Sequence, residues 1–489
     1  MACMNRSLVA ASSLLALAYP ICAQITPDTR INPTIQQIVD AISQERIAAT
    51  LRKLESFGSR FVLSPQDDPV RGIGAAKRWI HDELQSYSPR LEVSYQDFAA
   101  KKGVRLVRDV DLSNVVAVLP GITQPNRFIL VTAHYDSVNI VYKPYTGEEQ
   151  MIASAVRQGT DEAEARRYRQ LVPAELERGP ADPEATAAAA IAPGVTDDGS
   201  GTAVVMELAR VMSQHQFGKT LVFIAFSAEE IGEGGSQAWA EMAKQKNMQI
   251  EAVLNNDIVG SDVSGNGRSA TNVLRVFSGA EESPTRELGR YVKRTGERYV
   301  PSMQLEMVFR RDRFLRGGDH MPFAERGFAA VRLTTASENF ANQHSATDTF
   351  ANTSVPYTTR VAKINSAVAA SLALAPAPPV LNFTWNSGPR KGGHEPMLTR
   401  GKSRYDAVLH WLPNKEADLA GYNVLLRATT SPDWERVIWV GNVNGYTMPD
   451  VSIDDVVIGV QAVDKDGNAS IVSPYLEPTV NQMVTPVAK

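Results

Sequence analysis

The sequence predicts an α/β protein built on a mixed, mostly parallel β-sheet with helices on both faces, followed by a C-terminal all-β sandwich. Two observations support this fold class. Short, fully apolar runs alternate with segments of helical periodicity, which is typical of strands covered on both faces. After the proline-rich segment at residues 373–380, the pattern changes to short alternating runs separated by turn residues, which is typical of a sandwich.

Helical segments come first in the chain. Residues 33–86 carry apolar side chains every three or four positions, in IQQIVDAISQERIAATLRKLESF and again in GIGAAKRWIHDELQSY. Strand-like runs follow, with helical segments such as TAVVMELARVMSQ and SPTRELGRYVKRT between some of them. In such sheets, functional groups gather where strands end. The predicted strands are LEVSYQDF, NVVAVLP, RFILVTAHYDS, TLVFIAFSAEE, AVLNNDIVG, VLRVF and FAAVRLTT.

Two segments interrupt this pattern. Residues 142–193 are polar and rich in Ala, Glu and Arg, and we interpret them as an insertion out of the sheet. The insertion is either a lid that restricts substrate length or a peripheral elaboration. Residues 373–380, ALAPAPPV, form a linker between a domain at residues 24–372 and the sandwich at residues 381–489.

The C-terminal segment resembles a fibronectin type III-like module. Trp411 lies in an early strand, DLAGYNVLLR forms a middle strand, and GVQAVDKDGNAS forms a late strand that closes on a turn. The segment contains no obvious catalytic set. We therefore expect it to bind, to act as a spacer, or to pack against the preceding domain.

Residues 1–23 have the pattern of a secretory signal peptide. Arg6 precedes an apolar stretch at residues 8–18, and Pro20 ends that stretch before the small residue Ala23. The stretch is too short to cross a bilayer. An N-terminal helix of the fold and, through Cys22, a lipoprotein anchor are the alternatives. We expect an exported chain, periplasmic or secreted, that is cleaved after Ala23.

Composition limits the classes of binding partner and the residue types that could form a metal site. The net charge is -4 and no long basic block is present, which argues against nucleic acid or an anionic membrane as the main partner. No other stretch of about 18 apolar residues predicts a membrane span. Both cysteines, Cys3 and Cys22, lie in the predicted signal peptide, so any metal site must use His, Asp and Glu. The oligomeric state stays open.

Histidines and carboxylates follow several of the predicted strands. Each has an ordinary structural interpretation by itself, as a turn, a helix cap or a loop residue. Together they match two zinc ions that share one bridging carboxylate, which require two histidines and three carboxylates. An HxD pair places both side chains on one face, so the carboxylate can orient a metal-bound imidazole. The residues are His134 and Asp136 in VTAHYDS, Asp197 in PGVTDDGSG, Glu229 and Glu230 in FSAEEIG, Asp257 in NNDIVG and His344 in NQHSATDT.

The order and strand-end context of these motifs resemble the co-catalytic zinc exopeptidase family. That family includes bacterial secreted aminopeptidases, aminopeptidase Y, glutamate carboxypeptidase and glutaminyl cyclases. The resemblance spans about residues 40–370 and implies two zinc ions as cofactors. The implied ligands are His134 and Asp257 for one zinc, Glu230 and His344 for the other, and Asp197 as the bridge.

The resemblance also implies roles for residues next to these ligands. Glu229 becomes the general base, which accepts a proton from water and passes it to the leaving amine. Asp136 becomes the partner of His134. The peptide bond between Asp197 and Asp198 is expected to be cis.

The segment RGGDHMPFAERG resembles a loop that helps to form the family's substrate pocket. Asp319 and His320 are therefore candidate substrate-binding residues, with a structural turn as the alternative. Some compact relatives carry a tyrosine just before the last histidine, where this chain has Gln343. Tyr135 or His320 would then have to supply a donor to the oxyanion, unless the zinc ions act alone.

The resemblance implies an exported, zinc-dependent aminopeptidase that removes N-terminal residues from peptides. A carboxypeptidase or dipeptidase of the same fold is the alternative, because Arg310, Arg311 and Arg316 offer basic groups for a terminal carboxylate. A glutaminyl cyclase is disfavoured, since such enzymes use a single zinc. A non-catalytic binding protein is also disfavoured, because it would have no need of Glu229.

Overall fold

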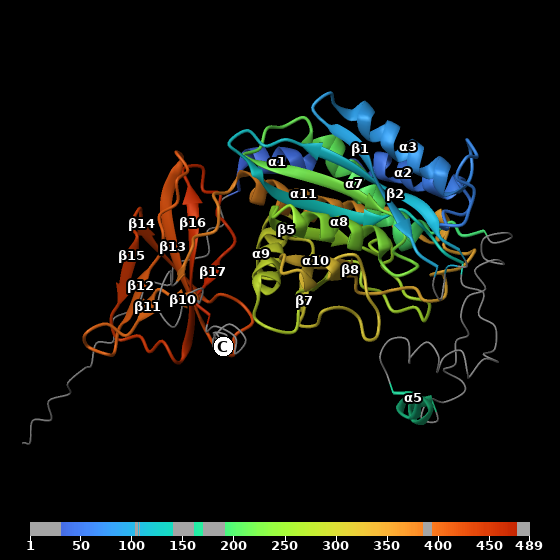
Figure 1. Ribbon diagram of the computed structural model, residues 1–489. Helices are drawn as coiled ribbons and strands as arrows, with labels where there is room; N and C mark the ends of the chain where they lie inside the picture. Colours follow the sequence, from blue (N-terminus) through green and yellow to red (C-terminus); the bar gives the residue numbers. More distant parts are fainter. Residues whose placement is uncertain are drawn as a thin grey trace, which may run out of the picture.

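The computed structural model describes residues 31–102, 106, 108–139, 161–169, 191–384 and 394–476 (Figure 1). The predicted signal peptide at residues 1–23 lies outside the described residues, as does most of the predicted insertion at residues 142–193. From the insertion, the structure describes helix α5 (Glu162–Arg169) and residues 191–193. The lid interpretation therefore stays a prediction.

An eight-stranded mixed sheet forms the centre of the larger part of the molecule, in the order β1-β2-β4-β3-β5-β8-β6-β7. The neighbouring strands β4, β3, β5 and β8 run parallel, whereas β1 and β2 pair antiparallel at one side and β6 pairs antiparallel with β8. The prediction of a mixed sheet with a parallel centre is confirmed. The strands are β1 (Glu92–Ala100), β2 (Val110–Leu119), β3 (Gln124–His134), β4 (Lys219–Phe226), β5 (Gln249–Asn256), β6 (Val273–Phe277), β7 (Gln304–Val308) and β8 (Ala330–Thr335).

Helices cover both faces of this sheet, as the apolar runs predict. Alternate side chains of β4 enter two different cores: Leu221 and Phe223 pack with α7 and α11, while Val222 and Ile224 pack with α8 and α10. Every residue of β4 is buried, which explains why the strand is apolar without alternation. The helices are α1 (Pro33–Asp40), α2 (Gln44–Ser56), α3 (Gly72–Tyr87), α7 (Ser200–Met212), α8 (Gly234–Gln245), α9 (Pro284–Tyr299), α10 (Met321–Glu325) and α11 (Val355–Leu374).

The C-terminal part consists of antiparallel sheets and lies beside α1 and α9 (Figure 1). Its core includes Trp411 and Tyr422, whose ring centroids are 5.3 Å apart. The all-β prediction is confirmed, while the fibronectin type III resemblance stays a prediction. The strands are β9 (Asn382–Thr384), β10 (His394–Pro396), β11 (Leu398–Thr399), β12 (Ala407–His410), β13 (Leu419–Ala428), β14 (Arg436–Gly441), β15 (Gly445–Met448), β16 (Val456–Asp464) and β17 (Ser473–Pro474).

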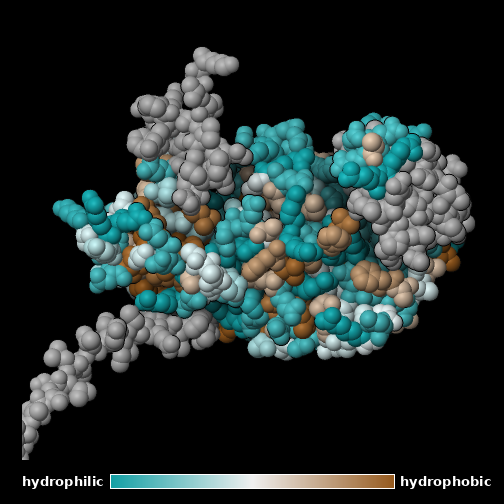
Figure 2. Space-filling model, turned by 90° about the horizontal axis from the view of Figure 1, so that it is seen from below, coloured by the Kyte–Doolittle hydropathy of each residue, from teal (hydrophilic) through white to brown (hydrophobic). Residues whose placement is uncertain are grey.

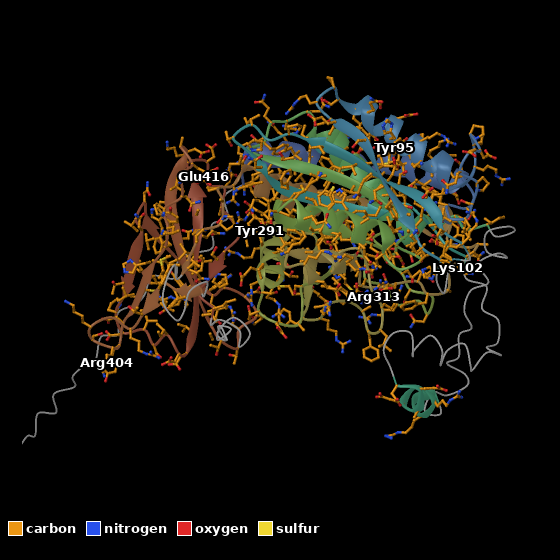
Figure 3. All side chains as sticks on the ribbon, viewed as in Figure 1. Tyr95, Lys102, Tyr291, Arg313, Arg404 and Glu416 are labelled. Atoms are coloured by element: carbon orange, nitrogen blue, oxygen red, sulfur yellow. The ribbon has the colours of Figure 1, made fainter. Side chains whose placement is uncertain are left out.

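On the face of the molecule seen from below, hydrophilic side chains predominate (Figure 2). Figure 2 shows separate apolar patches among hydrophilic side chains on the face seen from below. Among the described helices, none is long and apolar enough to cross a membrane. The two parts of the molecule meet along α9, where Tyr291 faces the C-terminal sheets (Figure 3) and its hydroxyl donates a hydrogen bond to the Ala469 carbonyl at 3.1 Å.

Candidate metal centre

The predicted ligands gather at the carboxyl-terminal ends of three neighbouring parallel strands. His134 is the last residue of β3, Glu229 and Glu230 follow the end of β4, and Asp257 directly follows β5. Because β3 is parallel to both β4 and β5, these ends meet at one edge of the sheet. Asp197 reaches the same place from the turn η2 (Val195–Gly199) just before α7, in which Asp197 and Asp198 have non-helical backbone angles.

Asp197 lies between the two histidines. Its Oδ1 atom is 3.3 Å from His134 Nε2, and its Oδ2 atom is 3.0 Å from His344 Nε2. Asp257 Oδ1 lies 3.9 Å from His134 Nε2, and Glu230 Oε2 lies 3.2 Å from His344 Nε2. Two sets of donor atoms therefore adjoin, one on each carboxylate oxygen of Asp197.

These donors suit a bound cation. The atoms of His134, Asp197 and Glu230 lie within 4.8 Å of one another, as do those of His134, Glu229 and Asp257. His134 Nε2 is buried and makes no hydrogen bond to the described residues, although it faces carboxylate oxygens. Imidazole nitrogen and carboxylate oxygen are ligands that zinc accepts. The second group contains Glu229, so proximity alone does not separate a ligand from a base.

Crowding of buried carboxylates perturbs their protonation. Burial raises the pKa of Glu229 to about 7, and the charges of Asp257 and Asp197 add to the rise while His134 opposes it. Burial also raises the pKa of Glu230, with a further contribution from Asp197. A cation among these groups would stabilise their ionised forms and lower both pKa values.

The carboxylate of Asp136 connects the end of β3 to the two glutamates. It accepts the backbone N–H of Glu229 at Oδ1 (3.2 Å) and that of Glu230 at Oδ2 (3.3 Å). His134 Nδ1 lies 3.4 Å from Asp136 Oδ1 and 3.1 Å from the Asp136 carbonyl oxygen. Ala228, with φ of 68°, turns the chain sharply before the glutamates. Asp136 thus holds both glutamates through its carboxylate and the imidazole through its carbonyl oxygen, with the carboxylate nearby.

The segment around Asp197 is held by two further carboxylates. The Asp197–Asp198 peptide bond is cis, as the resemblance implies. Asp198 accepts the backbone N–H groups of His134 (3.3 Å) and Ile258 (3.2 Å). Asp348 accepts the backbone N–H of Asp197 at 3.0 Å. Asp348 was missed from the sequence, although it belongs to the same HSATDT motif as His344.

Arg332 is a second residue that sequence reasoning missed. Its side chain is 0% exposed, and its Nη2 atom lies 2.8 Å from Asp257 Oδ1. Its Nη1 atom lies 3.2 Å from Asp312 Oδ2, so the guanidinium joins two buried carboxylates. The available signal was a single arginine inside the otherwise apolar run FAAVRLTT, which becomes β8.

Of the two predicted oxyanion donors, Tyr135 is directed elsewhere, and one ring nitrogen of His320 is engaged while its Nδ1 atom is buried without a hydrogen bond to a described residue. The hydroxyl of Tyr135 donates a hydrogen bond to the Ser113 carbonyl at 2.8 Å, so the prediction for Tyr135 is wrong. His320 Nε2 lies 2.7 Å from the Arg311 carbonyl oxygen, which occupies that nitrogen. Asp319, the other predicted pocket residue, is fully buried, and burial together with the charge of Glu229 raises its pKa.

The fold and this donor set define an α/β metallohydrolase. A family model described as Peptidase family M28 matches residues 114–369, and the chain belongs to that family and is a metallopeptidase. It is 32% identical over 470 residues to a "Probable zinc metalloprotease" of Pyrenophora tritici-repentis, covering 89% of this chain and 85% of that one. It is also 32% identical to a protein of the same description from Pyricularia oryzae, covering 89% and 83%. The Legionella pneumophila LapA aminopeptidase structure aligns with a TM-score of 0.49 and 17% identity, covering 72% of this chain and 78% of that one.

Proposed function

We propose that the chain is an exported aminopeptidase that removes N-terminal residues from peptides, with two zinc ions and Glu229 as general base. One observation carries the proposal. The two carboxylate oxygens of Asp197 face two different histidines, at 3.3 Å and 3.0 Å, so that two ligand sets share this carboxylate. A shared carboxylate is the arrangement by which two metal ions lie side by side.

Each proposed zinc has its own ligands besides Asp197. His134 and Asp257 would hold one ion, and Glu230 and His344 the other. When bound, zinc ions lower the pKa of water and polarise a substrate carbonyl. The remaining chemistry belongs to the side chains of the protein.

Glu229 is placed for proton transfer. Its side chain is 14% exposed, whereas that of Glu230 is 3% exposed, so Glu229 has better access to substrate and water. A carboxylate whose pKa has moved toward neutrality can accept a proton and release it again within one turnover. Glu229 would take the proton from the attacking water and deliver it to the leaving amine. Asp136 would hold the backbone of Glu229 in place during this transfer.

The charges near the site favour a substrate with a free α-amine. Glu229 and Asp319 lie within electrostatic range of each other, and in their ionised forms they would attract a positive group. Recognition of a terminal carboxylate would instead need an available basic side chain. Arg311 is paired with Glu325 at 2.5 Å and Arg316 with Glu338 at 2.9 Å, whereas Arg310 lies over the Phe314 ring at 5.6 Å without an ion pair to a described residue. Arg310 therefore remains the basic side chain on which the carboxypeptidase or dipeptidase alternative rests.

The export proposal rests on the sequence pattern of residues 1–23. Expression of the full chain in a bacterial host, followed by N-terminal sequencing of the protein from the periplasm and the medium, tests it. We expect the processed protein to begin at Gln24. An unprocessed chain that stays in the cytoplasm would contradict export.

A substrate panel tests the activity. We expect hydrolysis of aminoacyl substrates and of peptides with a free N-terminus, but not of their N-acetylated counterparts. Amidation of the C-terminus should have little effect. A chelator should abolish the activity, and titration with zinc should restore it, with about two ions per chain by elemental analysis. Equal cleavage of N-acetylated and free peptides would exclude an aminopeptidase, and full activity at one ion per chain would exclude the two-zinc mechanism.

A further inference from the structure

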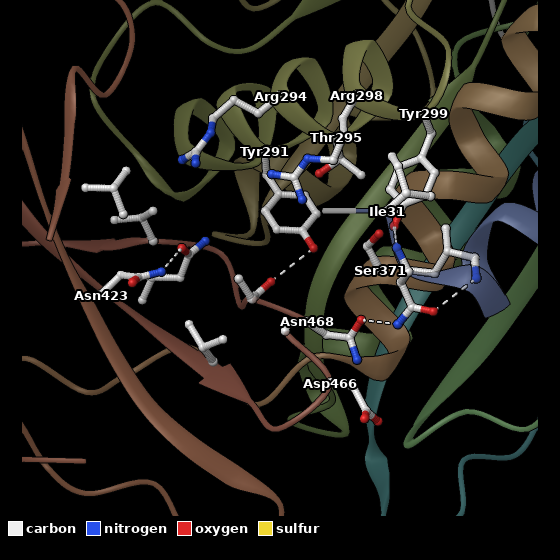
Figure 4. Close-up of a pocket in the computed structure, with 18 of the residues that line it drawn as sticks. Ile31, Tyr291, Arg294, Thr295, Arg298, Tyr299, Ser371, Asn423, Asp466 and Asn468 are labelled. Atoms are coloured by element: carbon white, nitrogen blue, oxygen red, sulfur yellow. Dashed lines mark hydrogen bonds between the residues drawn. The ribbon is translucent and has the colours of Figure 1, made fainter. Parts of the chain in front are cut away.

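A cavity separate from the metal centre lies between α9 and the C-terminal sheets. Its volume is about 210 Å³, and none of the predicted metal ligands lines it. Its walls come from α9, from the residues before α1, and from strands β13, β14 and β16 with the turn after β16 (Figure 4). Roughly 10–15 Å³ of such volume holds one water molecule, so this cavity has room for a small ligand together with water.

Hydrogen bonds between the two parts of the molecule fix the cavity walls. The Asn32 side-chain amide donates to Asn468 Oδ1 at 2.9 Å, and the Tyr291 hydroxyl donates to the Ala469 carbonyl at 3.1 Å (Figure 4). On the sheet side, the Asn423 amide donates to Gln461 Oε1 at 3.3 Å. The cavity is therefore built from both parts and does not depend on a single loop.

Three arginines at four-residue intervals line the cavity from one face of α9. Arg290 is neutralised, because it pairs with Glu282 at 2.8 Å and also with Glu287. Neither Arg294 nor Arg298 makes a hydrogen bond or an ion pair with a described residue. Two guanidinium groups thus share a partly enclosed space with no ion-pair partner among the described residues.

The nearby carboxylates do not compensate these charges. Glu287 and Asp433 act on Arg294 only through space, and Glu287 already binds Arg290 and the indole N–H of Trp434. Asp466, in the turn after β16, also lines the cavity but makes no ion pair with Arg294 or Arg298. Burial and the positive charge of Arg298 lower the pKa of Arg294. Like charges four residues apart on a helix repel each other, so the repulsion between Arg294 and Arg298 destabilises α9. A bound anion would remove this repulsion.

We propose that this cavity is a binding site for a small oxyanion, held between Arg294 and Arg298. Guanidinium groups bind oxyanions through paired, charge-assisted hydrogen bonds, which makes two neighbouring arginines a fitting receptor. On the facing strands, the Asn423 amide has one N–H beyond its bond to Gln461 Oε1, whereas the Gln461 amide already donates to the Ser470 carbonyl at 2.6 Å. An anion bound here would add a bridge between α9 and the C-terminal sheets and stabilise their contact.

Calorimetry and thermal unfolding of the zinc-loaded full chain test the proposal, with inorganic phosphate as the probe and chloride at equal ionic strength as the reference. We expect one phosphate per chain and a rise in Tm of about 1–2 °C when phosphate exceeds its dissociation constant roughly tenfold. Arg294→Gln and Arg298→Gln should each weaken binding at least about tenfold. In chloride alone, neither variant should have a lower Tm than the wild type, because each removes a repulsion.

Two further variants make the test specific. Arg294→Lys keeps the charge but loses the paired donors, so it should weaken phosphate binding while folding normally. Arg400→Gln removes an exposed arginine outside the cavity, which pairs with Asp454, and should leave the phosphate response unchanged. A response that persists in both Arg294→Gln and Arg298→Gln would place the anion elsewhere, including at the metal centre. Equal effects of phosphate and chloride, or a fall in Tm of Arg294→Gln in chloride, would also overturn the proposal.

Discussion

The two adjacent glutamates should respond differently to the same substitution. Glu230 Oε2 lies 3.2 Å from His344 Nε2, whereas Glu229 Oε2 lies 3.9 Å from His134 Nε2. Glu229 nevertheless falls within ligand distance of His134 and Asp257. Glutamine keeps the shape of either side chain but removes its charge and its capacity to take a proton. Glu229→Gln and Glu230→Gln therefore separate a base from a ligand.

The expected magnitudes follow from the proposed roles. General acid–base catalysis contributes about 10²–10⁴ in rate, so Glu229→Gln should lower kcat by that factor while the zinc content stays at about two per chain. Glu230 is a buried, charged member of one ligand set. Glu230→Gln should lower the zinc content to about one per chain after dialysis, and zinc added in excess should restore part of the rate.

Zinc content by elemental analysis and kcat on the best aminoacyl substrate measure the two effects separately. Glu241→Gln is a matched control, because Glu241 lies on α8, is about half exposed and pairs with Arg326. It should change neither quantity. If Glu229→Gln loses zinc as Glu230→Gln does, Glu229 is a ligand and the assignment is wrong. If Glu229→Gln keeps a tenth of the wild-type kcat or more, Glu229 is not the general base.

Three further predictions concern stability. Chelation of zinc should lower Tm by at least about 5 °C in scanning fluorimetry, because the buried carboxylates then repel one another; an unchanged Tm would contradict a metal at this site. Arg332→Met should lower the free energy of unfolding by about 3–5 kcal/mol in urea, since Asp257 and Asp312 lose a buried partner; a variant as stable as the wild type would contradict this pairing. Burial alone would raise the pKa of Glu338, but Arg313, Arg316 and other arginines lower it from 4.5 to about 2. The ionised Glu338 should therefore add about 3 kcal/mol to the free energy of unfolding above pH 4.5. This contribution should fall to about 1 kcal/mol at pH 3 and vanish below pH 2. In urea unfolding, Glu338→Gln should lower the free energy of unfolding by about this amount at pH 7 and by less at pH 3. A difference between variant and wild type that does not change with pH would contradict the prediction.

Much of the sheet could be predicted because its strands are buried on both faces. The fully apolar runs that become β3, β4 and β5 leave few alternatives to a covered, parallel centre. The strand order could not be predicted, since β2 pairs with β4 and β6 pairs antiparallel with β8 through contacts far apart in the chain. Strand pairing depends on tertiary packing, which no local pattern records.

The residues of the site, like the strands, include some that the sequence predicts and some that it does not. Residues at strand ends, such as His134 and Asp257, were predictable because parallel strands bring their ends together. Arg332 was not, since its partner Asp257 follows a different strand. The error at Tyr135 was avoidable: successive side chains on extended chain point to opposite sides, so a residue between His134 and Asp136 has to point away from them. Its hydroxyl accordingly reaches Ser113, the residue paired with Asp97 in the β1–β2 ladder.

The position of Asp136 explains how two adjacent glutamates can have separate roles. The side chains of adjacent residues point in different directions, but they keep those directions only if the backbone that carries them is fixed. The Asp136 carboxylate receives both backbone N–H groups, one on each oxygen, and lies 3.4 Å from the imidazole of His134. The proposed base, one proposed ligand of each zinc and the turn after β4 are therefore held by the single residue Asp136. A displacement of Asp136 would therefore shift the backbone of Glu229 and Glu230 together, and with it both their side chains.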